Sequence, residues 1–144
     1  MERPASIVRF EQLYFAHIGV GLAASLLALM HSGAALLASG AAEYTRLLLP
    51  AGMVIALLTQ AALWFGIARK GASVAKWILV VFTAFNVLGA LFAVFALVTG
   101  FGGAGTSLPS LALSLVASVL LYAAVSMLFR PDTKPWFGEG DAAA

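Results

Sequence analysis

Cysteine is absent from the 144 residues, and charged residues make up only 10% of them. Without cysteine the chain forms no disulfide framework, thiolate nucleophile or cysteine-ligated metal site. A soluble domain usually carries about 25% charged residues, because its surface must meet water. The charges here are too few to cover a water-soluble domain of this length.

Charge is also missing from three long stretches of the chain. Asp, Glu, Lys and Arg do not occur between Gln12 and Ala42, between Leu47 and Ala68, or between Trp77 and Phe129. A bilayer core of roughly 30 Å needs about 20 apolar residues of helix, so these stretches predict one, one and two crossings. With 62% apolar residues and a mean hydropathy of +1.02, we expect an all-α fold, an integral membrane up-down bundle of four transmembrane helices.

The expected crossings run over residues 13–38, 47–68, 77–99 and 108–129, within a transmembrane domain of residues 13–129. Residues 1–12 are expected to form an interfacial segment. Pro4 can begin a helix there, because proline in a first turn gives up only an N–H that has no partner. Residues 130–144 form a polar tail, and no long linker divides the chain, which predicts one domain.

Short polar or glycine-rich segments join the crossings. They are GAAEYTR (40–46), RKGASVAK (69–76) and GFGGAGTS (100–107). The third segment has too many glycines to continue a helix comfortably. Ser107 and Pro109 then predict an N-cap and first turn for the fourth helix.

The positive charges lie mostly on one side of these crossings. With the N-terminus in the cytoplasm, the outside loops hold only Arg46, and seven basic residues lie inside. The seven are Arg3, Arg9, Arg69, Lys70, Lys76, Arg130 and Lys134. Because Lys and Arg near helix ends resist translocation, we expect an N-in/C-in topology.

The basic turn between the second and third crossings is flanked by Trp64 and Trp77, at the depth where aromatic anchors meet lipid headgroups. Its basic cluster also suits anionic headgroups. An alternative reading takes LLASGAAEY as a signal-peptidase site, which would leave three crossings and an external N-terminus. The preceding apolar stretch exceeds the usual length of about 7–15 residues for such a signal.

Three polar residues are expected at similar depth within the crossings. Gln60 lies eight residues before Ala68, roughly 12 Å from the cytoplasmic helix end at about 1.5 Å per residue. By the same rule Asn86 lies at roughly 13 Å and Tyr122 at about 10 Å, and His17 belongs to the same half. These side chains either form interhelical hydrogen bonds or line a polar pocket for a small molecule, a lipid headgroup or a proton.

His17 and His31 are fourteen residues apart, which places them within roughly 40° on one helix surface. This spacing resembles that of the ligands on one helix of membrane di-haem b-type cytochromes. Since the chain holds only two histidines, haem ligation would require a symmetric dimer. The alternative is that both imidazoles form hydrogen bonds near the interfaces. We expect no other cofactor and no metal site.

Several functional classes lack their sequence patterns. The chain has no H-E-x-x-H, G-x-S-x-G or P-loop motif. Its basic residues flank apolar spans and form no basic face, so nucleic acid is not an expected partner. The crossings hold no carboxylate, which argues against an ion-coupled transporter with an acidic relay.

The two ends of the chain, ERPASIVRFEQLY and FRPDTKPWF, resemble those of a loose group of small, uncharacterised four-helix proteins of the bacterial inner membrane. An Arg-Pro-x-Ser opening, a basic turn before the third helix and a Trp-Phe pair near the C-terminus recur in that group. The resemblance implies an inner-membrane location and a tail whose Trp136 and Phe137 fold back onto the membrane surface. Because proline disfavours the helical region for the preceding residue, Pro135 predicts an extended tail.

From these patterns we expect a non-enzymatic membrane protein, an accessory subunit that binds helices or lipids in a larger complex. Its expected partners are membrane lipids and other membrane proteins or further copies of itself. The first alternative is a small oligomeric transporter or channel that uses the Gln60, Asn86 and Tyr122 layer. The second is a haem-binding homodimer through His17 and His31.

Overall fold

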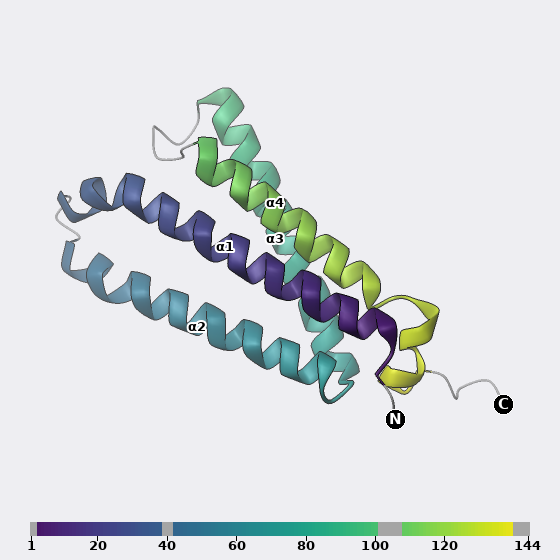
Figure 1. The fold of residues 1–144 in the computed structure, drawn as a ribbon. Coiled ribbons are helices and arrows are strands. Elements are labelled where there is room, and N and C mark those ends of the chain that lie inside the picture. The colour runs from purple at the N-terminus through teal and green to yellow at the C-terminus, as the bar shows by residue number, and fades with distance from the viewer. Residues whose placement is uncertain (1–2, 39–41, 101–107, 140–144) are drawn as a thin grey trace.

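The computed structural model describes residues 3–38, 42–100 and 108–139, with side chains at 3–31, 48–100 and 108–139. Four helices follow one another, α1 (Ala5–Ala38), α2 (Ala42–Ala68), α3 (Ser73–Thr99) and α4 (Leu108–Met127) (Figure 1). Two short 3-10 turns, η1 (Pro131–Thr133) and η2 (Pro135–Phe137), come after α4. The described residues contain no strand. Each of the four helices is long and apolar enough to cross a membrane, so the all-helical prediction is confirmed and the chain has the character of a multi-pass membrane protein.

The first three helices begin before the expected crossings, whereas α4 begins at Leu108 as expected and ends at Met127, two residues before its expected end. α1 is continuous from Ala5, where the carbonyl of Pro4 accepts hydrogen bonds from the N–H groups of Ile7 and Val8 at 3.0 and 3.3 Å. α2 and α3 begin four or five residues earlier than expected, at Ala42 and Ser73. Ser107, the expected N-cap of the fourth helix, lies outside the described residues. In the first three helices, the hydrophobic stretch therefore marks where the helix is apolar and does not mark where it begins.

The four helices pack in a ring. α1 has its most extensive packing with α4 and also contacts α2, while α3 contacts α2 and α4. The start of α1, the α2–α3 turn and the two 3-10 turns lie at one end of the molecule, called the basal end below (Figure 1). This arrangement is that of an up-down bundle, in which sequence neighbours run antiparallel.

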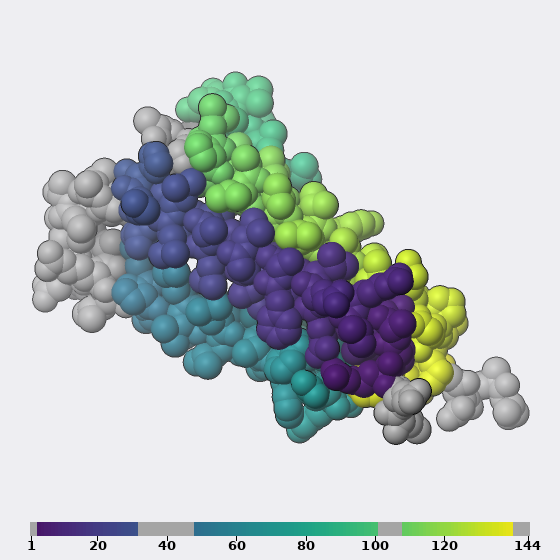
Figure 2. All heavy atoms as spheres, viewed as in Figure 1, coloured from purple at the N-terminus to yellow at the C-terminus, as the bar shows by residue number. Residues whose placement is uncertain are grey.

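The buried core lies close to the basal end. Its members come from all four helices and from η2: Ile7, Phe10, Tyr14, Leu63, Ile67, Ala68, Leu79, Leu121, Ala124, Val125, Leu128 and Phe137. Away from this end the helices diverge (Figure 1), and Figure 2 shows small openings between α1 and α2. The bundle is tightly packed at its base and looser beyond it.

The C-terminal tail is folded onto the basal end, and the prediction of an extended tail is wrong. Lys134 has helical angles, φ −55° and ψ −48°, despite the proline that follows it. Tertiary contacts outweigh the local preference: the Trp136 indole N–H donates to the carbonyl of Ile67 at 2.9 Å, and the Ser73 hydroxyl donates to the carbonyl of Phe137 at 3.0 Å. Phe137 is buried in the core.

Gly71 makes this close contact possible. It adopts φ +58°, a conformation that disfavours residues with a Cβ. The backbone of Trp136 lies directly against it, so a Cβ added at Gly71 would overlap the Trp136 carbonyl oxygen and lie 3.3 Å from the carbonyl carbon. The α2–α3 turn and the tail are therefore packed backbone to backbone.

Two further polar contacts join the tail to the helices. The N–H and the hydroxyl of Ser6 donate to the Asp132 carboxylate at 3.2 and 2.8 Å. Lys76, only 3% exposed, donates to both oxygens of Glu139 at 2.9 and 3.0 Å. The tail thereby connects the start of α1 with the start of α3.

Candidate functional site

A cavity of about 450 Å³ lies among the helices immediately beyond the core. All four helices line it: Tyr14 and His17 from α1, Gly52, Ile55, Ala56, Thr59, Gln60 and Leu63 from α2, Leu79, Phe82 and Asn86 from α3, and Leu121 from α4. Two further cavities, of about 390 and 210 Å³, share His17 and Asn86 with it. These three spaces together are called the interior cavity below.

Gln60 and Asn86, expected at one depth, line the same cavity. The Gln60 side-chain oxygen Oε1 is buried and has no hydrogen-bond partner. Asn86 is exposed, unlike the Gln60 oxygen, and its carboxamide makes no hydrogen bond within the described part of the chain. A buried amide without a partner costs free energy, because it has lost its hydration and gained nothing. Both amides are thus available to a molecule that enters the cavity.

His17 also lines the cavity, and its orientation is fixed by α4. Its Nδ1 lies 2.8 Å from the carbonyl of Ala117. A carbonyl only accepts hydrogen bonds, so Nδ1 must carry the proton. In the neutral ring Nε2 is then the acceptor, a third polar atom in a cavity that otherwise has largely apolar walls.

Tyr14 was not singled out from the sequence, yet it forms the boundary between core and cavity. It is 1% exposed, and its hydroxyl donates to the backbone carbonyl of Gln60 at 3.3 Å. Phe10, Tyr14 and His17 stack along α1, with ring centroids 5.2 and 6.1 Å apart. Their spacing of four and three residues is the signal that could have revealed it, because such residues share one helix face.

Tyr122, by contrast, lies on the outward face of α4 with 67% of its surface exposed, and it lines none of the cavities among the described residues. The neighbouring Leu121 lines the cavity in its place. The structure thus brings Gln60, Asn86 and His17 together and leaves Tyr122 outside the group.

His31 is exposed and does not line the interior cavity. Its Nδ1 lies 3.1 Å from the carbonyl of Leu27, one turn earlier in α1. As at His17, Nδ1 is therefore the protonated nitrogen and Nε2 is the one available to a ligand. The two histidines share this tautomer but differ in surroundings.

The basic residues in and beside the α2–α3 turn differ in exposure. Arg69 and Lys70 are exposed and lie over the rings of Trp64 and Phe65, at 5.4 and 5.5 Å. Lys76 is buried instead, with its ammonium 4.7 Å from the ring of Phe129 and paired with Glu139. Only the first two can meet lipid headgroups.

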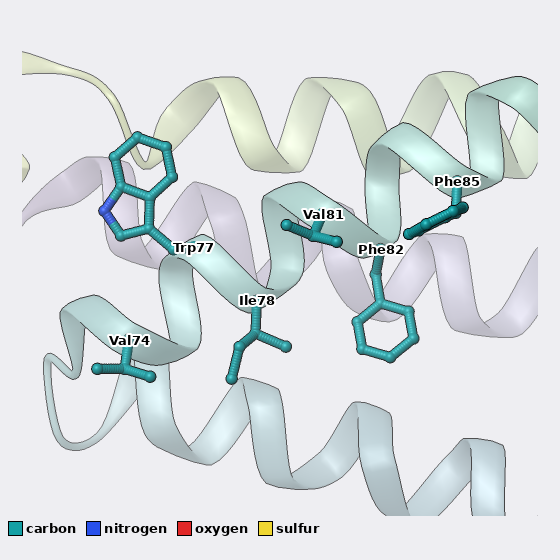
Figure 3. Close-up of a pocket in the computed structure, with 6 residues that line it drawn as sticks. All are labelled: Val74, Trp77, Ile78, Val81, Phe82 and Phe85. Carbon is teal, nitrogen blue, oxygen red and sulfur yellow. The ribbon is translucent and has the colours of Figure 1, made fainter.

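The two tryptophans beside this turn are held differently. The Trp64 indole N–H donates to Glu11 at 3.1 Å, and Trp77 packs edge-on against Phe129 at 5.9 Å. Figure 3 shows Trp77 in a shallow apolar groove along the outer face of α3, where Ile78 and Phe82 project toward α2. All six residues that line this groove are exposed and apolar, as expected of a surface that meets lipid chains.

At the basal end, the carboxyl of Asp132 in η1 has a shifted pKa. The hydrogen bond that it accepts from the Ser6 hydroxyl lowers the pKa of its carboxyl below the ordinary value. The charged form of Asp132 therefore stabilises the docked tail.

The described residues contain no cluster of three or more His, Cys, Asp or Glu side chains that could hold a metal ion. Comparison of the chain with protein-family models, curated proteins and solved structures finds no significant match. The chemistry of the interior cavity is therefore argued from its own residues: two carboxamides, one imidazole and a largely apolar wall, a set suited to binding.

Proposed function

We propose that this chain is a non-enzymatic integral membrane protein that binds a lipid-like molecule in the interior cavity, as an accessory subunit of a larger membrane complex. The observation that carries the proposal is the buried, unpartnered side-chain oxygen of Gln60, which lines a cavity together with the exposed amide of Asn86 among four membrane-length helices. In hydrocarbon there is no bulk water to satisfy such groups. A bound molecule supplies the missing hydrogen bonds.

The size of the cavity favours a small molecule over a partner helix. One turn of helix with its side chains, about 10–12 Å across and 5.4 Å long, occupies roughly 400–600 Å³. The largest of the three spaces, at about 450 Å³, would take a single turn of a crossing helix. The same volume lies within the range of roughly 300–1,000 Å³ typical of small-molecule sites.

The membrane location and orientation belong to the same proposal. The chain lies in the bacterial inner membrane with both termini in the cytoplasm, so the basal end faces the cytoplasm. Support comes from the seven basic residues on that side, of which Arg9 and Lys76 lie near the starts of α1 and α3 and the other five lie outside the four helices. Reporters fused to either end should be active in the cytoplasm and inactive when they require export. A periplasmic signal from either fusion would contradict this orientation.

Purification from native membranes tests the binding role. The full chain, extracted in mild detergent, should retain a lipid-like molecule detectable by native mass spectrometry, and a Gln60→Leu, Asn86→Leu double variant should lose it. Tyr122→Phe is the matched control, because this polar residue lies outside the cavity. A protein partner that copurifies at fixed stoichiometry supports the accessory role. Wild type that carries neither lipid nor partner would contradict the proposal.

A small transporter is the second candidate, and the continuity of the cavities favours it. Small or polar residues of α1, namely Tyr14, His17, Gly21 and Ser25, follow one another along the three adjoining spaces. Such a row offers a path along the bundle interior. Reconstituted vesicles that release a trapped small polar solute only when they contain the protein would support transport over simple binding.

A haem-binding homodimer is the third candidate. Its support is the orientation of His17 and His31, since metal-ligating histidines usually donate their other ring nitrogen to a backbone carbonyl or a carboxylate. Purified protein with a Soret absorption band that disappears in His17→Ala would favour this candidate. A colourless preparation after growth with added haem would dismiss it.

A further inference from the structure

The interior cavity offers only neutral polar groups. No Asp, Glu, Lys or Arg is among the described residues that line its three spaces. A charged headgroup at this position would lose its hydration and find no counter-charge beside it, which is strongly unfavourable. The cavity therefore selects an uncharged ligand.

Gln60 defines what the polar part of that ligand must do. Its Oε1 is buried without a partner and needs a hydrogen-bond donor. The NH₂ groups of Gln60 and Asn86 need acceptors. An ether or a ketone accepts only and would leave Oε1 unsatisfied, whereas a hydroxyl donates and accepts through one oxygen.

The remaining polar side chains of the largest space are already occupied. The Thr59 hydroxyl donates to the carbonyl of Ile55 at 2.8 Å, and the Tyr14 hydroxyl donates to the carbonyl of Gln60. The Nδ1 of His17 is held by Ala117, so that only its Nε2 faces a ligand as an acceptor. One acceptor on Gln60, one on His17 and two amide donors therefore await a partner.

The walls of the cavity determine the apolar part of the ligand. Leu63 and Leu79, at 8% and 2% exposure, belong to the core that limits the cavity toward the basal end. Ile55 of α2 and Phe82 of α3 also line the cavity, yet they are 64% and 51% exposed. The cavity thus opens between α2 and α3, where an apolar chain can extend into the bilayer while its polar end stays at Gln60.

From these features we propose that the interior cavity is a binding site for a neutral lipid alcohol, an apolar chain or ring that carries a hydroxyl group. The inference rests on the proposed lipid-binding function and adds the chemistry of the bound headgroup. The hydroxyl donates to Gln60 Oε1 and accepts from the Asn86 amide. Aliphatic and phenolic hydroxyls share this chemistry.

Competition between matched probes tests the hydroxyl requirement on the wild-type chain. The full protein in lipid nanodiscs is photolabelled with a diazirine-bearing dodecanol, and unlabelled competitors are added. We expect 1-dodecanol to compete about tenfold better than dodecyl methyl ether, the factor expected for one hydrogen bond. Dodecanoate should compete poorly because of its charge. A parallel 4-octylphenol arm shows whether a phenolic or an aliphatic hydroxyl is preferred.

Two variants test whether the preference for a hydroxyl group depends on Gln60. Gln60→Leu should reduce the alcohol-over-ether preference to less than twofold, whereas Tyr122→Phe should retain it, because Tyr122 lies outside the interior cavity. Folding of each variant is checked by circular dichroism and gel filtration, and Gln60→Met serves in place of a leucine variant that fails to fold.

The outcomes separate this inference from the function on which it rests. If ether and alcohol compete equally, or if Gln60→Leu keeps the preference, the hydroxyl inference is overturned while lipid binding stands. If no amphiphile competes and no lipid copurifies with the wild type, lipid binding itself is wrong. Preference for the alcohol that disappears only in the Gln60 variants supports the inference.

Discussion

Replacement of Gly71 by alanine should release the C-terminal tail from the basal end. Two effects add at this position. A residue with a Cβ pays about 1–2 kcal/mol to adopt a left-handed conformation, and the new Cβ overlaps the carbonyl oxygen of Trp136. A backbone carbonyl cannot rotate away as a side chain does, so the overlap is relieved only when the tail moves.

Gly138 provides a matched control for the first effect alone. It also has a positive φ, +69°, but a Cβ there would meet nothing within 4 Å. Gly138→Ala should therefore cost only the conformational strain, equivalent to a factor of about 5–30 in the equilibrium between docked and released tail. Gly71→Ala adds the overlap, and we expect a shift of at least about hundredfold, or roughly 3 kcal/mol.

Thiol labelling measures the released fraction. The chain has no cysteine, so a single Thr133→Cys substitution, at a position only 1% exposed, gives one reporter thiol in an otherwise unreactive protein. Its rate of reaction with a maleimide should rise about 5–30-fold with Gly138→Ala and at least about hundredfold with Gly71→Ala. Equal rates in the two glycine variants would refute the close packing of Trp136 on Gly71.

Substitutions at three further contacts give additional predictions. Glu139→Gln should lower the free energy of unfolding by about 1–3 kcal/mol, because it leaves the buried Lys76 ammonium without its counter-charge, whereas Lys76→Met should lower it by less than about 1 kcal/mol. Equal losses of stability in thermal unfolding would argue against this explanation. Ser6→Ala should raise the pKa of Asp132 toward its ordinary value of 3.8. The pKa of Asp132 is lower in the folded chain than in the unfolded chain, so the stabilisation by its charged form is full above the unfolded pKa and is lost as pH falls through the folded pKa. The difference in Tm between wild type and Ser6→Ala should therefore shrink below about pH 4. A difference that stays constant at lower pH would contradict this account. Tyr14→Phe should cost about 0.5–1.5 kcal/mol through its lost bond to Gln60, while Tyr122→Phe, on the outer face of the bundle, should change stability by less than about 0.5 kcal/mol; the reverse order would show that the outward placement of Tyr122 is wrong.

The presence of four helices could be predicted from the sequence because helices long and apolar enough to cross a membrane contain long stretches without charged residues. Long stretches without charge, such as the one from Trp77 to Phe129, follow directly from the cost of an ion in hydrocarbon. The shared depth of Gln60 and Asn86 followed from helix rise alone, and both line one cavity. Depth depends on counting residues, which a sequence supplies.

The direction in which a side chain points could not be predicted in the same way. A helix that is apolar all round has no polar stripe to reveal its inner face. Tyr122 lies on such a helix and is 67% exposed, whereas Tyr14, 1% exposed, shares one face of α1 with Phe10 and His17. The difference arises from the packing of α1 against its neighbours, which involves contacts far apart in the chain.

The conformation of the C-terminal tail could also not be predicted from the preferences of its own residues. The preference of Lys134 for an extended conformation is small beside the contacts of Trp136 and Phe137 with the α2–α3 turn, some 65 residues earlier in the chain. Lys76 was assigned to the basic turn for its charge. Its burial depends on Glu139, a residue 63 positions later.

The bond between Ser6 and Asp132 joins residues 126 positions apart, and this has a consequence for biosynthesis. The helices are synthesised in order as the ribosome extends the chain, but the base of the bundle stays unfinished until residues 131–139 have left the exit tunnel. Until then the Lys76 ammonium has no counter-ion and the first residues of α1 have no cap. Premature termination would therefore yield a product that has all four helices yet is incomplete at its base, a form that proteases could distinguish from the finished protein.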